Sequence, residues 1–144
     1  MKTTTKNAKE IAEQLDCGMR AYCHKKTGEL VFVPNETELY GIDLEAWDED
    51  LELLDNNYTD YHEIEKWTSG EAFQMMADFA EELTGNTQLQ NKLIDALNRS
   101  KPFRNFKFII DNSGDYRQQW FTFKNQWQQA FVERQLISLN NLEA

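Results

Sequence analysis

The sequence predicts an α+β fold with an N-terminal helix, a small antiparallel β-sheet and a C-terminal bundle of about four helices. Two patterns lead to this prediction. Side chains in residues 19–33 alternate in character around Thr27-Gly28, which is typical of a β-hairpin. Residues 68–136 repeat apolar side chains every three or four positions, which is the period of amphipathic helices. Because the chain of 144 residues contains no low-complexity linker, we expect a single domain over residues 1–144.

A short helix and the hairpin come first. Residues 6–16 form one apolar helix face, made of Ala8, Ile11, Ala12 and Leu15. Gly18 suits the left-handed conformation that often ends a helix. Pro34 ends the second strand of the hairpin, because proline cannot donate a hydrogen bond to a neighbouring strand. Since two strands alone are marginally stable, we expect residues 58–67 to supply a third strand.

The helices that follow are predicted from apolar periodicity and from residues that favour helix ends. We expect them from about Asp43 to 54, over 68–83 and 87–98, from Pro102 to about 111, and from about 115 to 136 or beyond. Capping boxes are predicted at Thr68 with Glu71 and at Thr87 with Gln90.

Two details of the helical region concern its core and its last helix. One of Met75 and Met76 is expected in the core, and Ser113 is predicted to cap the last helix. That helix has apolar residues on two sides. It therefore either contacts structure on more than one face or leaves an apolar patch for a partner.

Charge is distributed unevenly along the chain, whose net charge is −10. Residues 29–85 contain 17 acidic side chains and one basic side chain, Lys66. Residues 1–28 and 86–144 each have a net charge of +3. The middle of the chain therefore repels nucleic acid and anionic lipid, whereas the C-terminal part does not.

Several classes of protein are not indicated by the sequence. There is no phosphate-binding glycine loop and no nucleophile elbow. Cys17 and Cys23 are too few and too widely spaced for a zinc site, and Leu53 stands where a calcium loop needs glycine. We therefore predict no metal and no cofactor. No apolar run is long enough for a membrane span and residues 1–15 lack the apolar core of a signal peptide, so we expect a cytoplasmic protein without membrane contact.

Sequence motifs indicate a family. The segments KPFRNFK, DNSGDYRQQWFTFK and IAEQLDCGMRAYCHKKTGELV resemble the uncharacterised bacterial protein family numbered 0158 in the UPF series, over roughly residues 8–136. The resemblance implies a short helix and a Thr-Gly hairpin, an acidic stretch, a helix containing FRxFK and a final helix rich in Trp and Phe. In many members the FRxFK segment is richer in charged residues than here, where Asn105 and Phe108 occupy such positions. The resemblance implies no activity.

The charge pattern supports two functions of different classes. We predict a non-catalytic, acidic, soluble interaction protein, in which the acidic segment (residues 35–66) or an exposed aromatic face binds a basic or apolar protein partner. The alternative is binding of a polyanion such as nucleic acid. The candidate binding residues are then the basic side chains of the C-terminal helices: Arg99, Lys101, Arg104, Lys107, Arg117 and Lys124.

Other interpretations of the same residues remain open. The six basic side chains can instead pair with the acidic segment of the same chain, and the pI of about 4.6 makes nucleic acid the less favoured partner. A hydrolase or transferase that uses His62, Glu63 or Glu65 is the remote alternative, so the chain is predicted more as a binding protein than as an enzyme.

Overall fold

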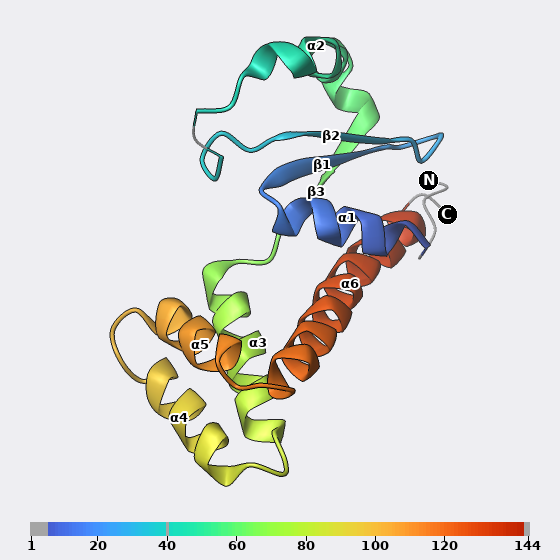
Figure 1. Cartoon of the computed structure of the whole chain (residues 1–144). Helices are drawn as coiled ribbons and strands as arrows, with labels where there is room; N and C mark the ends of the chain where they lie inside the picture. The colour runs from blue at the N-terminus through green and yellow to red at the C-terminus, as the bar shows by residue number, and fades with distance from the viewer. Residues whose placement is uncertain (1–5, 40, 143–144) are drawn as a thin grey trace. The chain divides into compact units, whose positions relative to one another are not determined.

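The computed structural model describes residues 6–39 and 41–142, and over these residues the fold is α+β, as the sequence predicts (Figure 1). The described residues group into two compact units. The sheet unit contains the chain up to Lys66 together with the residues from Gln128 onward, and the helical unit is Trp67–Trp127.

The sheet unit is built on three strands. They are β1 (Met19–His24), β2 (Leu30–Pro34) and β3 (Tyr61–Ile64). In the described chain they form one antiparallel sheet in the order β2-β1-β3. The hairpin and the third strand are thereby confirmed, although β3 is shorter than the predicted segment. Its first residues instead form a short 3-10 turn, η2 (Tyr58–Asp60).

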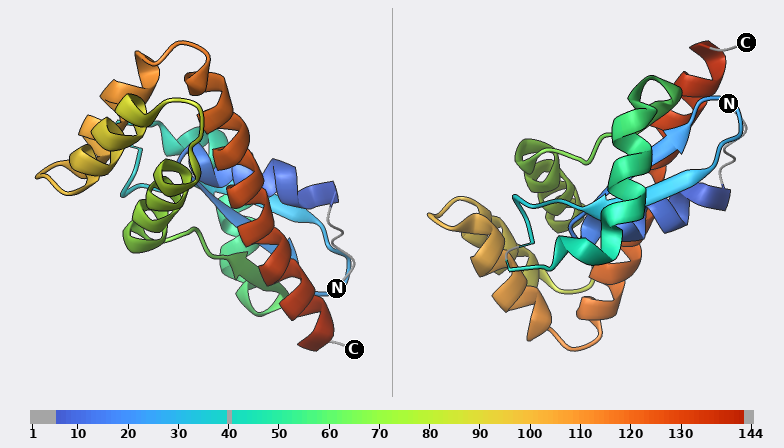
Figure 2. Two further views of the ribbon diagram at one scale, coloured as in Figure 1. Left: turned by 90° about the horizontal axis from the view of Figure 1, so that it is seen from below. Right: turned by 90° about the horizontal axis from the view of Figure 1, so that it is seen from above.

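Strand register gives the sheet two different faces. Ala21 of β1 lies opposite Phe32 and Ile64, and this face packs against α1 (Lys6–Asp16), whose apolar stripe is buried. Tyr22 lies opposite Val31 and Glu63 on the other face. There α2 (Asp48–Asn56) covers the sheet, on the side away from α1 (Figures 1 and 2). The helix predicted from Asp43 therefore exists, but its first turn is a 3-10 turn, η1 (Leu44–Trp47).

Gly18 connects α1 to β1 in a conformation that other residues rarely adopt. Its φ is +90°, and a Cβ atom built on it would lie 3.0 Å from Cγ of Leu39. A side chain at this position would therefore be strained and crowded. The glycine predicted to end the first helix is required by both the backbone and the packing.

The last helix, α6 (Tyr116–Leu142), belongs to both units, and from Gln128 onward it completes the sheet unit. Val132 and Leu136 are fully buried there. The buried amide of Gln128 donates to Oδ1 of Asp16 in α1 at 3.1 Å. The second apolar side of this helix, which includes Val132 and Leu136, therefore packs inside the sheet unit.

Gln135 of α6 holds the end of β3 through two reciprocal hydrogen bonds. The backbone N–H of Glu65 donates to Oε1 of Gln135 at 3.0 Å, and Nε2 of Gln135 donates to the carbonyl of Glu65 at 2.6 Å. The side-chain amide thus pairs with the backbone as a neighbouring strand would. The chain beyond β3 obtains both of these hydrogen bonds from one side chain.

We expect Gln135→Ala to lower the free energy of unfolding by about 1–2 kcal/mol, because both hydrogen bonds to Glu65 are lost. Urea denaturation measures the change. Gln129→Ala is the matched control on the same helix. The side-chain amide of Gln129 donates to the nearby side chain of Glu133 and does not hold β3. A control loss as large as that of Gln135→Ala would contradict this role.

The helical unit contains α3 (Ser69–Glu82), α4 (Thr87–Leu97), α5 (Pro102–Asp111) and the first part of α6. Thr68 and Glu71 form the predicted capping box, and Pro102 lies in the first turn of its helix as predicted. The unit's core brings these helices together through one buried cluster: Met75, Phe79, Ala80, Leu83, Leu89, Leu93, Leu97, Phe106, Ile110 and Trp120. Met75 is thus the core methionine, and Met76 is only partly buried.

Two predicted caps are wrong, because the side chains of Gln90 and Ser113 bond to the ends of the helices that precede them. Asn86, not Thr87, caps α4 by accepting from the N–H of Leu89. Gln90 instead donates to the carbonyls of Ala80 and Glu81. Free carbonyls at the end of α3 need donors, and Gln90 supplies them.

Ser113 likewise serves the helix before it. Its hydroxyl donates to the carbonyl of Ile110 at the end of α5, and α6 begins only at Tyr116. The serine therefore lies too far from α6 to cap it in the predicted way.

Candidate functional site

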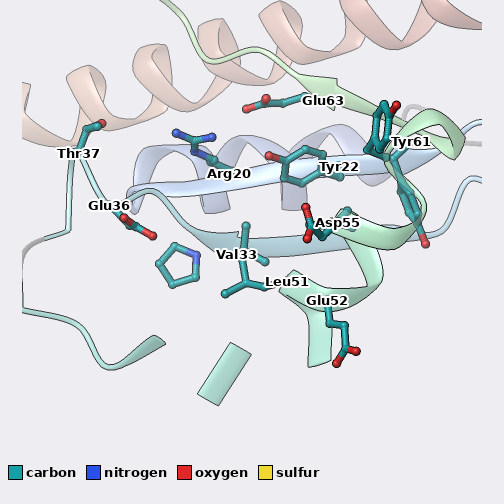
Figure 3. Close-up of a pocket in the computed structure, with 13 residues that line it drawn as sticks. Arg20, Tyr22, Val33, Glu36, Thr37, Leu51, Glu52, Asp55, Tyr61 and Glu63 are labelled. Atoms are coloured by element: carbon teal, nitrogen blue, oxygen red, sulfur yellow. The ribbon is translucent and has the colours of Figure 1, made fainter. Parts of the chain in front are cut away.

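A pocket of about 820 Å³ lies in the sheet unit between the sheet and α2 (Figure 3). β1 contributes Arg20 and Tyr22, β3 contributes Tyr61 and Glu63, and Val33 of β2 lies at the base of its apolar part. Pro34 also belongs to β2, and the remaining lining residues come from the segment after β2, from α2 and from η2: Glu36, Thr37, Leu51, Glu52, Leu54, Asp55 and Tyr58. The pocket thus combines side chains that are far apart in sequence.

The chemistry of the pocket is acidic and aromatic. Its lining has four carboxylates, three tyrosines and one guanidinium among thirteen residues. Three aliphatic side chains and one proline form its apolar part. One of the tyrosines, Tyr58, is 75% exposed. Carboxylates and phenol rings both attract cations, the first by charge and the second by the negative face of the ring.

Two side chains of the pocket have pKa values that nearby carboxylates help to raise. A hydrogen bond to Tyr22 raises the pKa of Arg20, against the opposing effect of burial, and the charges of Glu63 and Glu36 act in the raising direction. Burial raises the pKa of Tyr61, and the carboxylates of Glu29, Asp60 and Asp50 add to the effect. Nearby negative charge favours a positive guanidinium and disfavours a phenolate. The pocket therefore favours positive charge.

Only part of this pocket could be predicted from the sequence. The acidic segment, residues 35–66, supplies the α2 side and β3, but Arg20, Tyr22, Val33 and Pro34 were not among the candidates. The alternation of side chains along β1 could have identified Arg20 and Tyr22, because it puts them on the face opposite Ala21. Which element covers that face is decided only by the fold.

The six predicted basic residues lie in the helical unit, and three of them have partners there. Arg99 forms an ion pair with Asp95 at 2.7 Å. Arg117 lies 3.4 Å from Asp111, and its guanidinium is 4.6 Å from the ring centre of Phe121.

Lys124 shares the aromatic contact of Arg117, because its ammonium is 5.5 Å from the centre of the same Phe121 ring. Lys101, Arg104 and Lys107 are exposed on or next to α5. The six residues therefore do not form one uniform patch, since three are engaged by neighbours and three face solvent.

The residues of the remote catalytic alternative are not brought together. His62 lies opposite Cys23 in the sheet, and Glu63 lies opposite Tyr22, so the two side chains belong to opposite faces. The backbone of Glu65 is bonded to Gln135 beyond the strand. Cys23 is buried, and the neighbouring His24 belongs to the other face, where Nδ1 accepts from the N–H groups of Lys26 and Thr27.

The part of the chain that the structure describes has neither a metal-ligating cluster nor a membrane-spanning helix. Among those residues, no three His, Cys, Asp or Glu side chains are grouped so as to hold a metal ion. None of the described helices combines the length and the apolar character that crossing a bilayer requires.

Comparison with known proteins identifies a family over nearly the whole chain. Residues 4–141 match the family described as "Uncharacterised protein family (UPF0158)". Neither the curated proteins nor the solved structures include a match to this chain.

Proposed function

The chain belongs to the UPF0158 family, and we propose that it is a non-catalytic interaction protein of the bacterial cytoplasm whose acidic pocket binds a basic segment of a partner protein. The observation that supports this proposal most strongly is the lining of the pocket, which has four carboxylates and three tyrosines against one arginine. A lysine or arginine side chain complements all three features, because it brings positive charge, donors for carboxylates and a cation for aromatic faces.

The arrangement suits a peptide segment better than a small molecule. The pocket is only partly enclosed, and Tyr58, which is one of its lining residues, is largely exposed. Its apolar part, formed by Val33, Leu51 and Leu54, can receive the aliphatic portion of a long basic side chain. Charge complementarity of this kind increases the association rate and excludes acidic partners.

Neutralising pocket carboxylates is expected to weaken binding of a basic probe. The probe is a labelled peptide of about ten residues with alternating lysine and alanine, titrated by fluorescence anisotropy at about 50 and 200 mM salt. Asp55→Asn with Glu63→Gln should raise Kd about three- to tenfold at the lower salt, since two favourable charge contacts are lost. The difference should shrink at the higher salt.

The control removes the same charge outside the pocket. Glu45→Gln with Glu49→Gln changes two exposed carboxylates near or in α2 that do not line the pocket, and it should alter Kd by less than about twofold. Equal effects of the two double variants would show that net charge, and not the pocket, attracts the peptide. Absence of binding to the native chain at low salt would overturn the proposal.

A further inference from the structure

The outer face of α5 combines three basic side chains with an exposed aromatic ring. We define this face by Lys101, Arg104, Lys107 and Phe108, which precede or lie on α5 (Figure 1). Arg104 and Phe108 are four residues apart, and Arg104 and Lys107 three, so they are neighbours on the helix surface. Phe108 is 72% exposed, whereas Phe106 on the inner face is completely buried. We propose that the outer face of α5 binds single-stranded nucleic acid, with phosphates at the three cations and a base stacked on Phe108.

The three cations of this face are available to a ligand. Among the described residues of the helical unit, no carboxylate lies within ion-pairing distance of Lys101, Arg104 or Lys107. The nearest acid along the helix on this side, Asp111, forms its ion pair with Arg117. Among the described residues of the helical unit, Lys101, Arg104 and Lys107 are therefore not neutralised by an acidic side chain.

Phe108 offers an exposed aromatic ring beside these cations. A phenyl ring with 72% of its surface in water contributes little to the core, and it lies next to Lys107 and one turn after Arg104. Bases stack on exposed aromatic rings while cations hold the backbone, and this combination is how proteins bind single strands. A base inside a duplex is not accessible to such a ring, so the outer face of α5 is expected to discriminate against double strands.

The net charge of the helical unit differs from that of the whole chain. Residues 67–127 contain seven basic and seven acidic side chains, so this unit is neutral although the whole chain is not. Four of the acids, Glu71, Asp78, Glu81 and Glu82, belong to α3. The first turn of α5 has no acidic residue, which leaves the positive end of its helix dipole uncompensated. Within the helical unit, the stretch from Lys101 to Ile110 therefore presents three cations and no acidic side chain to a phosphate.

The test is a titration of the full chain with labelled oligonucleotides of about 15 nucleotides, as oligo-U, oligo-dT and a mixed-sequence duplex. We expect both single strands to bind more tightly than the duplex. Log K should fall with log salt concentration with a slope of about −2, as expected for three phosphates held on a single strand. Anionic lipid vesicles and poly-glutamate serve as polyanions without bases, and they should bind more weakly.

Variants separate stacking from charge. Phe108→Ala should weaken oligo-U binding about tenfold and leave the salt slope unchanged, because it removes the ring and no charge. Arg104→Gln should reduce the slope by about 0.7. Circular dichroism checks that each variant is folded, which is expected because both side chains are exposed.

Two controls match these substitutions. Tyr58→Ala removes an equally exposed ring from the acidic pocket, and Arg99→Gln removes a basic residue that is already paired with Asp95. Neither should change oligo-U affinity by more than about twofold. The proposal is overturned if no single strand binds at about 50 mM salt, if the duplex or the vesicles bind at least as tightly, or if Phe108→Ala has no effect.

Discussion

Replacing Phe106 with alanine is expected to lower the free energy of unfolding by about 3–5 kcal/mol. Phe106 is completely buried in the core of the helical unit. Its ring centre lies 4.9 Å from that of Trp120 in an edge-to-face arrangement and 6.4 Å from that of Phe79. The substitution therefore leaves a cavity and removes two aromatic contacts that add to the effect of burial.

Phe108→Ala is the matched control for this prediction, because it makes the same chemical change two residues further along α5. Phe108 is 72% exposed, so its loss should change the free energy of unfolding by no more than about 0.5 kcal/mol. Urea denaturation followed by tryptophan fluorescence measures both variants, since Trp120 contacts Phe106 directly. Comparable losses from the two substitutions would contradict the orientation of α5.

Replacing Leu136 with alanine is expected to lower the free energy of unfolding by about 2–5 kcal/mol, because it leaves a cavity in the core of the sheet unit. Leu136 is 1% exposed and lies in the part of α6 that belongs to this unit. Its neighbour Ile137 is 51% exposed, so Ile137→Ala should cost far less, about 0.5–1 kcal/mol. Far-UV circular dichroism in urea measures both. A larger loss from Ile137→Ala would contradict the register of α6 on the sheet unit.

The same two core variants test the expectation of a single domain over residues 1–144. If the chain unfolds as one cooperative domain, Phe106→Ala and Leu136→Ala shift the same transition, and fluorescence and circular dichroism coincide for each. If each unit unfolds by itself, Phe106→Ala moves the transition of the helical unit alone. The two variants therefore distinguish one cooperative domain from two.

Local signals along the chain predicted most of the secondary structure correctly. Gly18 at the end of α1, the capping box of Thr68 and Glu71, and Pro102 in the first turn of α5 are signals that act on the backbone within a few residues. The sequence reveals them because they act on the backbone of their own turn, although Leu39 also crowds Gly18 in the fold. The strands were predicted for a similar reason, since alternation along β1 already separates Ala21 from Tyr22.

The wrong caps show where local reasoning fails. Gln90 follows Thr87 at the spacing of a capping box, yet its amide bonds to the carbonyls of Ala80 and Glu81 at the end of another helix. A long polar side chain has several acceptors within reach once helices pack, and the stronger local pattern does not always prevail. Neither the spacing nor the composition of the segment contains that information.

The candidate sites divide in the same way. Acidic charge in residues 35–66 and basic charge in residues 99–124 were evident from composition. Composition did not show which of these charged side chains are available for binding. Arg117 is engaged by Asp111 and Phe121, whereas Arg104 and Lys107 remain at the surface. The distinction depends on which side chains the packing of α5 and α6 brings within reach.

The sequence by itself determined the α+β class, the order of the elements, the family and the separation of charge along the chain. These features follow from periodicity and from local backbone preferences. Tertiary structure alone decided that α2 covers the face of Arg20 and Tyr22 to form the acidic pocket, and that Phe106 is buried while Phe108 is exposed. Periodicity shows that a helix or strand has two faces, but burial is a property of the neighbours that the fold places against each face.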